Sequence, residues 1–243
     1  MLRTLLRRFC WLLLSLIVLS IALVLVFRWV TPPGTALMVE RKIQAYQAQQ
    51  EYRIAHQWLP WERLPEDLKM AVIAGEDQKF AEHKGFDIPA IKAALEHNSE
   101  GGTVRGASTI SQQVAKNLFL WSDRSWPRKA LEVWFTLWIE VLWPKERILE
   151  VYLNSAEWGE GIFGAEAAAQ HHFGLGASYL STQQAAQLAA VLPNPHAWNP
   201  AKPNAYISRR ATWIRQQMRQ LGGSHYLTQL QWTAPGWWPE FLR

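Results

Sequence analysis

Titratable side chains gather among apolar ones in a short stretch that begins with the adjacent acids Glu76 and Asp77. His83 follows within eight residues, and Ala74 and Phe80 provide apolar neighbours. A carboxyl group beside apolar side chains can have a raised pKa and act as an acid or a base. Glu76 is therefore our candidate base. Taken alone, each acid also fits a solvated surface residue, and the histidine fits a structural one.

Basic residues follow at spacings that suit a negatively charged substrate. A predicted helix begins with hydroxyl side chains near Ser108, which can cap it or bind an anion. Gln113 and Lys116 share a face of that helix, and Arg128 stands four residues before Glu132 on the next. Cations and a helix N-terminus beside two glutamates favour a phosphorylated substrate. The alternative is ordinary capping with a surface lysine.

The helix predicted over residues 127–143 is apolar over most of its surface. Its polar residues, among them Lys129, Glu132 and Glu140, are three or four positions apart and form one stripe. Charges in such surroundings are costly unless they are paired or used. Two interpretations stay open: a buried pair of Glu132 with Arg128 or Lys129, and a polar seam that lines a cleft.

Composition narrows the class of protein. Of 243 residues, 49% are hydrophobic and 19% charged, as in a globular chain with a proper core. The net charge of +5 is modest, and no nucleic-acid motif occurs, so we expect no nucleic-acid partner. Cys10 is the only cysteine, and the adjacent His171 and His172 point to different sides of a helix, so a metal site has little support.

An uncharged run from Phe9 to Phe27 predicts a transmembrane signal anchor, since a helix of this length rises about 28 Å. A cleaved signal peptide would have a shorter apolar core and a small-residue cleavage site. Three arginines precede the run and one follows it, which favours a cytoplasmic N-terminus. We therefore expect a single-pass membrane protein whose remaining chain lies on the far side of the membrane.

The remaining pattern predicts a mainly α protein. Capping signals and apolar periodicity predict helices at 65–75, 88–97, 108–120, 127–143, 145–154, 163–173, 181–192 and 203–221. We expect few strands, a mobile glycine-rich loop at 99–106 and an irregular tail from Trp232 onwards. The predicted organisation is an N-terminus and anchor at 1–30, a linker and membrane-proximal segment at 31–60, and a catalytic domain at 61–243.

From about residue 60 to 200 the chain resembles the peptidoglycan glycosyltransferases of the monofunctional biosynthetic type. Five motifs occur in order: Glu76-Asp-x-x-Phe80-x-x-His83-x-Gly85-x-Asp87, then Gly106 to Leu120, then Arg128-Lys-x-x-Glu132 with Glu140, then Lys145 to Asn154 with Gly159, Gly164, Glu166 and Phe173-Gly174, then Ala185 to Pro195. Ala107 and Ser111 depart from the family pattern. No transpeptidase domain follows, so the chain resembles the single-activity members.

The resemblance implies a mainly helical, lysozyme-like domain with a small membrane-proximal lobe. It implies a processive polymerase that joins the growing glycan, linked to undecaprenyl diphosphate, to the GlcNAc 4-hydroxyl of lipid II with inversion. The expected partners are lipid II, the nascent glycan strand and the lipid bilayer, and other cell-wall synthesis or division proteins are candidates.

The resemblance also implies residue roles. Glu76 matches the base, and Lys116 and Arg128 match diphosphate-binding residues. Glu132 matches a second essential glutamate, which is expected to orient these cations or to hold Mg²⁺ or Mn²⁺ on the diphosphate; no organic cofactor is expected. Six further residues are expected to position the substrate: Asp77, Phe80, His83, Thr109, Gln113 and Asn117.

Other functions remain as alternatives. A membrane-anchored, lysozyme-like hydrolase would need the carboxylates but not Lys116 and Arg128, whereas a scaffold of a division complex would need neither. The tryptophans at 121–143 fit either an aromatic core or the bilayer interface.

Overall fold

The computed structural model describes residues 2–101 and 106–231, and helices make up most of them. The mainly α prediction is confirmed, and every predicted helix lies within two residues of its expected ends. The tail from Trp232 onwards and positions 102–105 of the glycine-rich loop lie outside the described residues.

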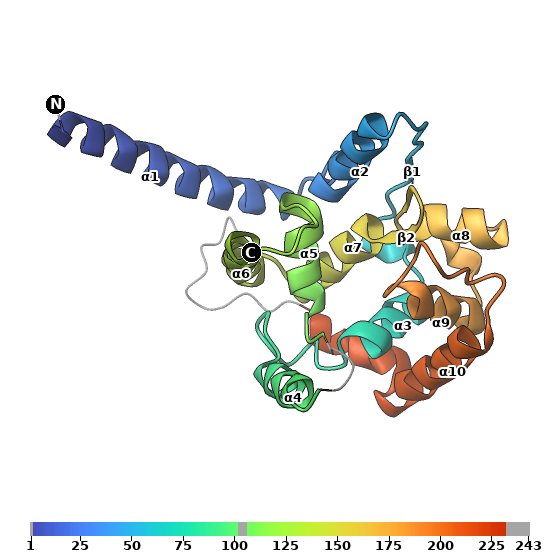
Figure 1. Ribbon diagram of the computed structural model, residues 1–243. Helices are drawn as coiled ribbons and strands as arrows, with labels where there is room; N and C mark the ends of the chain where they lie inside the picture. Colours follow the sequence, from blue (N-terminus) through green and yellow to red (C-terminus); the bar gives the residue numbers. More distant parts are fainter. Residues whose placement is uncertain (1, 102–105, 232–243) are drawn as a thin grey trace.

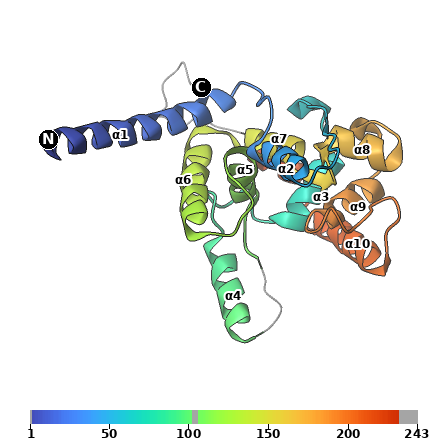
Figure 2. The ribbon, with the colours of Figure 1, turned by 45° about the horizontal axis from the view of Figure 1, so that its top comes forward.

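Helix α1 (Leu2–Phe27) projects from the body, as Figure 1 shows. It is the helix in the described part of the chain that is long and apolar enough to cross a membrane. Most of its side chains are exposed, and its C-terminal part packs on α6 (Figure 2). An apolar helix without protein around it fits a single-pass membrane anchor.

Helix α3 (Glu66–Glu76) lies at the centre of one half of the body. It packs against α9 (Thr182–Val191), α10 (Ala205–Gln220) and the 3-10 helix η3 (Gly223–Leu230). Leu68 to Ala74 are all buried, so this helix is covered on every side except its end. The last helical residue, Glu76, is thereby held on a rigid element at the edge of the core.

The other half is built around α5 (Ile110–Phe119), which packs between α6 (Trp126–Leu142) and α7 (Lys145–Ser155). Phe119 stacks on Phe135 of α6, with ring centroids 4.4 Å apart. Helix α4 (Ile88–Ser99) extends away from α1 in Figure 2. Because α5 contacts both neighbours, it is held between α6 and α7, and its Gln113 side chain reaches Glu76 at the end of α3.

Segment 31–60, expected as a linker, contains structure that the sequence did not indicate. Helix α2 (Ala36–Gln47) is capped by Thr35 and packs on α5. Strand β1 (Ala55–His56) pairs in parallel with β3 (Ile162–Phe163), which pairs antiparallel with β2 (Glu157–Gly159). Strands of two or three residues are too short to show alternation, so periodicity could not predict this sheet.

The remaining elements cover the sheet and the end of α7: η1 (Trp61–Arg63), α8 (Ala165–Phe173) and η2 (Ala177–Tyr179). Asn154 of α7 is fully buried, and its side chain bonds both the N–H and the carbonyl of Leu59. This amide joins the 31–60 segment to the helical body.

Candidate active site

Glu76 is largely buried at the end of α3, where it borders a cavity of about 460 Å³. Its Oε2 accepts a hydrogen bond of 2.9 Å from Gln113 Nε2, and its Oε1 lies 3.6 Å from a guanidinium nitrogen of Arg210. Burial raises the pKa of Glu76, and the Gln113 bond, Arg210 and Lys116 oppose that rise. A carboxylate with a raised pKa beside a cavity suits a general base.

Asp77 and His83 shape the loop that follows the candidate base. The Asp77 carboxylate accepts from His83 Nε2 at 2.9 Å and from the backbone N–H of Ile110 at 3.0 Å. Gly85 N–H donates to His83 Nδ1, so Nε2 carries the proton that Asp77 accepts. A carboxylate on an otherwise unpaired N–H of α5 fixes the start of that helix against Glu76.

Thr109 and Phe80 support the site from inside the fold. Thr109 forms a capping box with Gln112 at the start of α5, and its hydroxyl donates to Gly85 O at 2.6 Å. Phe80 is fully buried, with the Lys145 ammonium 4.5 Å from its ring centroid. Both residues were expected to position the substrate, and in the structure both act on the loop and helix that surround Glu76.

Gly85 is constrained by backbone conformation and by space. It has a φ of +88°, and a Cβ there would lie 2.8 Å from Thr136 Cγ2. We expect Gly85→Ala to lower the free energy of unfolding by roughly 1–3 kcal/mol, measured by thermal or denaturant unfolding.

Gly101 provides the matched control for this prediction. It also has a positive φ, of +80°, but a Cβ there would meet no atom of the described residues within 4 Å. Gly101→Ala carries the backbone strain without the clash, so it should cost less. Equal losses for the two variants would show that contact with Thr136 contributes nothing.

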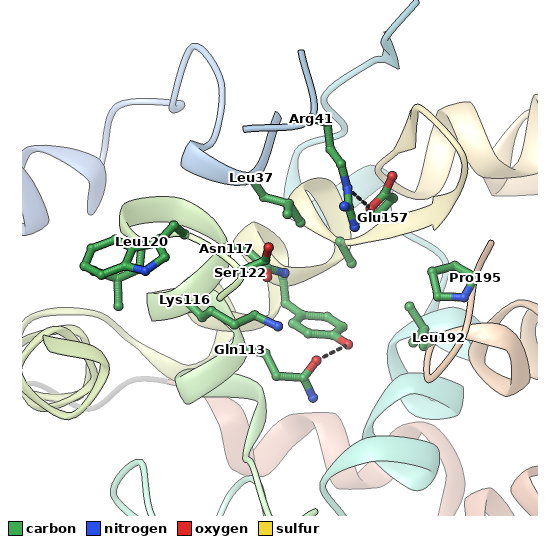
Figure 3. A pocket seen from close by; sticks show the side chains of 13 residues that line it. Leu37, Arg41, Gln113, Lys116, Asn117, Leu120, Ser122, Glu157, Leu192 and Pro195 are labelled. Carbon is green, nitrogen blue, oxygen red and sulfur yellow. Dashed lines mark hydrogen bonds and ion pairs between the residues drawn. The ribbon is translucent and has the colours of Figure 1, made fainter. Parts of the chain in front are cut away.

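Lys116 and Gln113 extend from α5 into a second cavity, of about 180 Å³, as Figure 3 shows. Burial lowers the pKa of Lys116, while Glu132 raises it and Arg128 lowers it further. Asn117 borders the same cavity, and its Oδ1 is buried without a hydrogen-bond partner in the described part of the chain. The cavity is therefore lined by a desolvated ammonium group and by an amide oxygen that has no hydrogen-bond partner among the described residues.

Arg128, Lys129 and Glu132 form a compact ion-pair cluster on α6. Arg128 NH1 lies 2.5 Å from Glu132 Oε2, and Lys129 Nζ contacts the other carboxylate oxygen. The buried-pair interpretation of this helix is thus confirmed. The polar-seam interpretation also holds in part, because the cluster lies close enough to shift the pKa of Lys116, which lines a cavity.

The sequence-predicted residues therefore meet at one place. Gln113 connects Glu76 on α3 to α5, and Lys116 connects α5 to the ion pairs of α6. Gln113 therefore links the candidate base at the end of α3 to the helix that carries the candidate cation Lys116. A substrate that spans both cavities would place its hydroxyl near a carboxylate and its phosphates near ammonium and guanidinium groups.

Sequence reasoning missed three residues around this centre. Tyr152 is fully buried on α7, and its hydroxyl lies 3.2 Å from Gln113 Oε1, so it directs the amide N–H groups towards Glu76. Burial raises the pKa of Tyr152 well above its usual value, which keeps it a donor. It lies within the fourth motif, which could have indicated it. Arg41 of α2 lines the cavity beside Lys116, and Arg210 of α10 contacts Glu76; both lie outside all five motifs.

The residues at Glu132 do not fit a resident divalent cation. Both carboxylate oxygens already pair with Arg128 and Lys129. Over residues 2–101 and 106–231, no group of three or more His, Cys, Asp or Glu side chains could hold a metal. The Mg²⁺ or Mn²⁺ ion expected there stays a prediction, and the chemistry described below uses only side chains.

Comparison with known proteins shows which family the chain belongs to. Residues 41–219 match the family model described as Transglycosylase, which covers every side chain of the site. The chain belongs to the transglycosylase family. The resemblance read from the five motifs is thereby confirmed, and the enzyme is a glycosyltransferase.

Relatives with high identity extend the match to the whole chain. The biosynthetic peptidoglycan transglycosylase of Ectopseudomonas mendocina (strain ymp) is 68% identical over 242 residues, which covers 100% of both chains. That of Stutzerimonas stutzeri (strain A1501) is 66% identical with the same coverage. One from Pseudomonas putida (strain KT2440) is 65% identical over 95% of this chain and 98% of its own.

Proposed function

We propose that this transglycosylase extends peptidoglycan strands in cell-wall synthesis. It transfers the growing glycan from undecaprenyl diphosphate to the GlcNAc 4-hydroxyl of lipid II, with inversion at the anomeric carbon. One observation carries the proposal: the buried carboxylate of Glu76 bonds Gln113 of α5 and lies close enough to Lys116 of the same helix to be affected by its charge, and Lys116 in turn lies near the ion pairs of α6. The family match and the peptidoglycan transglycosylases among its relatives support the substrate class.

The acceptor side of the reaction needs a base. The 4-hydroxyl oxygen of lipid II attacks the anomeric carbon of the donor while its proton passes to Glu76. The new β bond forms as the α bond to the diphosphate breaks, so a single displacement inverts the centre. The cavity of about 460 Å³ beside Glu76 and Asp77 is large enough for part of a sugar acceptor.

The donor side needs positive charge, because the departing diphosphate takes the bonding electrons. Lys116 supplies an ammonium that no carboxylate pairs with among the described residues. Arg128 supplies a planar guanidinium that suits phosphate oxygens, and Lys129 adds a third cation. Glu132 holds Arg128 and Lys129 in place, since a carboxylate cannot itself stabilise a leaving diphosphate.

Contacts between α1 and α6 tie this site to the membrane anchor. Trp134 Nε1 donates to Ser20 Oγ at 3.1 Å, and Trp143 Nε1 donates to the Val24 carbonyl at 2.7 Å. Exposed apolar side chains, Leu131, Val133, Leu137 and Val141, form a stripe along α6. We infer that α6 lies along the bilayer surface, with Arg128 at the depth of a lipid diphosphate.

The tryptophans divide accordingly. Trp143 is buried, so it belongs to the core, whereas Trp126 is 89% exposed and Trp121 is 41% exposed. Amphipathic aromatic side chains favour the bilayer interface, which supports a membrane-facing role for the exposed pair. The three arginines in the first turns of α1 favour a cytoplasmic N-terminus, which would place the catalytic part on the periplasmic side.

Incubation of the full-length enzyme with labelled lipid II in vesicles tests the proposal. We expect glycan polymer to lengthen and undecaprenyl diphosphate to be released. Release of soluble fragments from preformed glycan strands would instead indicate the hydrolase alternative. Absence of turnover in folded protein would favour the scaffold alternative.

A further inference from the structure

Arg210 reaches the end of α3 from a part of the chain outside the five motifs. It lies on α10, which packs on α3, and its NH2 group bonds the Gly75 carbonyl at 3.3 Å. The same nitrogen lies 3.6 Å from Glu76 Oε1. A cation thus sits where α3 ends and where the candidate base begins.

The two oxygens of Glu76 are held differently. Oε2 accepts a hydrogen bond of 2.9 Å from Gln113, whereas Oε1 has an ion-pair contact that is too long for a good hydrogen bond. The carboxylate is therefore clamped between α5 and α10. Oε1 accepts no hydrogen bond from the described residues, so it has a lone pair available for a proton.

Simple structural support does not account for this arginine. Its Nε is buried and has no hydrogen-bond partner over the residues that the structure describes. A guanidinium that served only to tie two helices together would be expected to satisfy its buried donors, since an unmade bond costs free energy. What this side chain does provide is positive charge next to Glu76.

We propose that Arg210 is a positioning residue for proton transfer: it keeps the Glu76 carboxylate ionised and directs Oε1 towards the acceptor hydroxyl. This inference rests on the proposed role of Glu76 as the base. It adds a residue from α10 to a site that the motifs place on α3, α5 and α6.

The charges around Glu76 support this role. Lys116 of α5 and Arg210 of α10 lower the pKa of Glu76, and Asp77 raises it. On α7, Tyr152 is neutral because burial raises its pKa. Tyr226 of η3 bonds the Gln78 carbonyl and also has a raised pKa, and α9 carries no charged side chain. Arg210 therefore supplies one of two cations that oppose the effect of burial.

The pH dependence of polymerisation tests this proposal. Without Arg210 the pKa of Glu76 rises, so a larger fraction of the base is protonated at low pH. In full-length enzyme acting on lipid II, we expect Arg210→Met to move the acid limb of the kcat/KM profile upward by roughly one pH unit. The rate should recover at high pH, and Arg210→Lys should restore most of the wild-type profile.

Arg209 gives a matched control, because it is the preceding residue and is exposed. Arg209→Met should leave the profile unchanged. An unshifted acid limb in Arg210→Met would overturn the proposal, as would an equal loss at every pH accompanied by a lower Tm. Glu76→Gln, assayed in parallel, separates the two hypotheses. If it is inactive while Arg210→Met behaves as wild type, only the role of Arg210 fails; if it polymerises normally, the proposed base itself fails.

Discussion

Glu76→Gln is expected to slow lipid II polymerisation by roughly 10²- to 10⁴-fold, the usual contribution of a general base. Glutamine has nearly the same size and keeps an oxygen that can accept from Gln113, but it cannot take a proton. It also removes the cost of a buried negative charge, so the Tm should not fall substantially. The measurement is the initial rate of polymer formation beside a thermal unfolding curve.

Glu82→Gln provides the matched control for this variant. Glu82 lies in the loop that follows α3, close in sequence to Glu76, but it is exposed. Its replacement removes one carboxylate and changes the net charge by the same amount as Glu76→Gln. The rate of polymerisation should stay at the wild-type value. If Glu76→Gln elongated glycan as fast as this control, Glu76 would have no part in the mechanism.

Lys116→Met is expected to reduce the rate by roughly 10²- to 10³-fold, as for loss of one group that stabilises charge in the transition state. No carboxylate pairs directly with Lys116 in the described chain, so its removal leaves no buried charge without a partner. The fold should therefore be as stable as the wild type, or slightly more stable. Rates and unfolding curves measured on the same preparation test both statements.

Arg128→Ala gives the informative contrast. It removes a cation but also breaks a buried pair with Glu132, so both activity and stability should fall. A wild-type rate for Lys116→Met would contradict the cation role on the donor side. Equal destabilisation in the two variants would contradict the difference between Arg128, which pairs with Glu132, and Lys116, which pairs with no carboxylate of the described residues.

The helices were predictable because each carries its signals locally. Ser181 and Gln184 form the capping box at the start of α9. Pro65 precedes α3, as expected. Helix α2 and the three short strands were not predictable, because their stability comes from packing on α5 and α8 and not from periodicity. Helices could therefore be predicted where caps and apolar periodicity determine them, and elements that depend on tertiary packing could not.

The candidate site was predictable in its residue types but not in its connections. The motifs indicated Glu76, Gln113 and Lys116, yet only the fold shows that Gln113 bonds Glu76 directly. Phe80 and Thr109 matched the motifs and proved to support the site from within the fold. Arg210 could not be found, because contact between α10 and the end of α3 depends on the tertiary packing of both helices.

The configuration of the bond formed from lipid II tests most directly whether a base and a cation cluster act together in one displacement. Polymer made by the full-length enzyme can be isolated, and the anomeric configuration of its new linkages determined by NMR. We expect β linkages throughout, because attack opposite the departing diphosphate inverts the α-linked donor. Retained α linkages would require a covalent intermediate and would contradict the roles given to Glu76, Lys116 and Arg128.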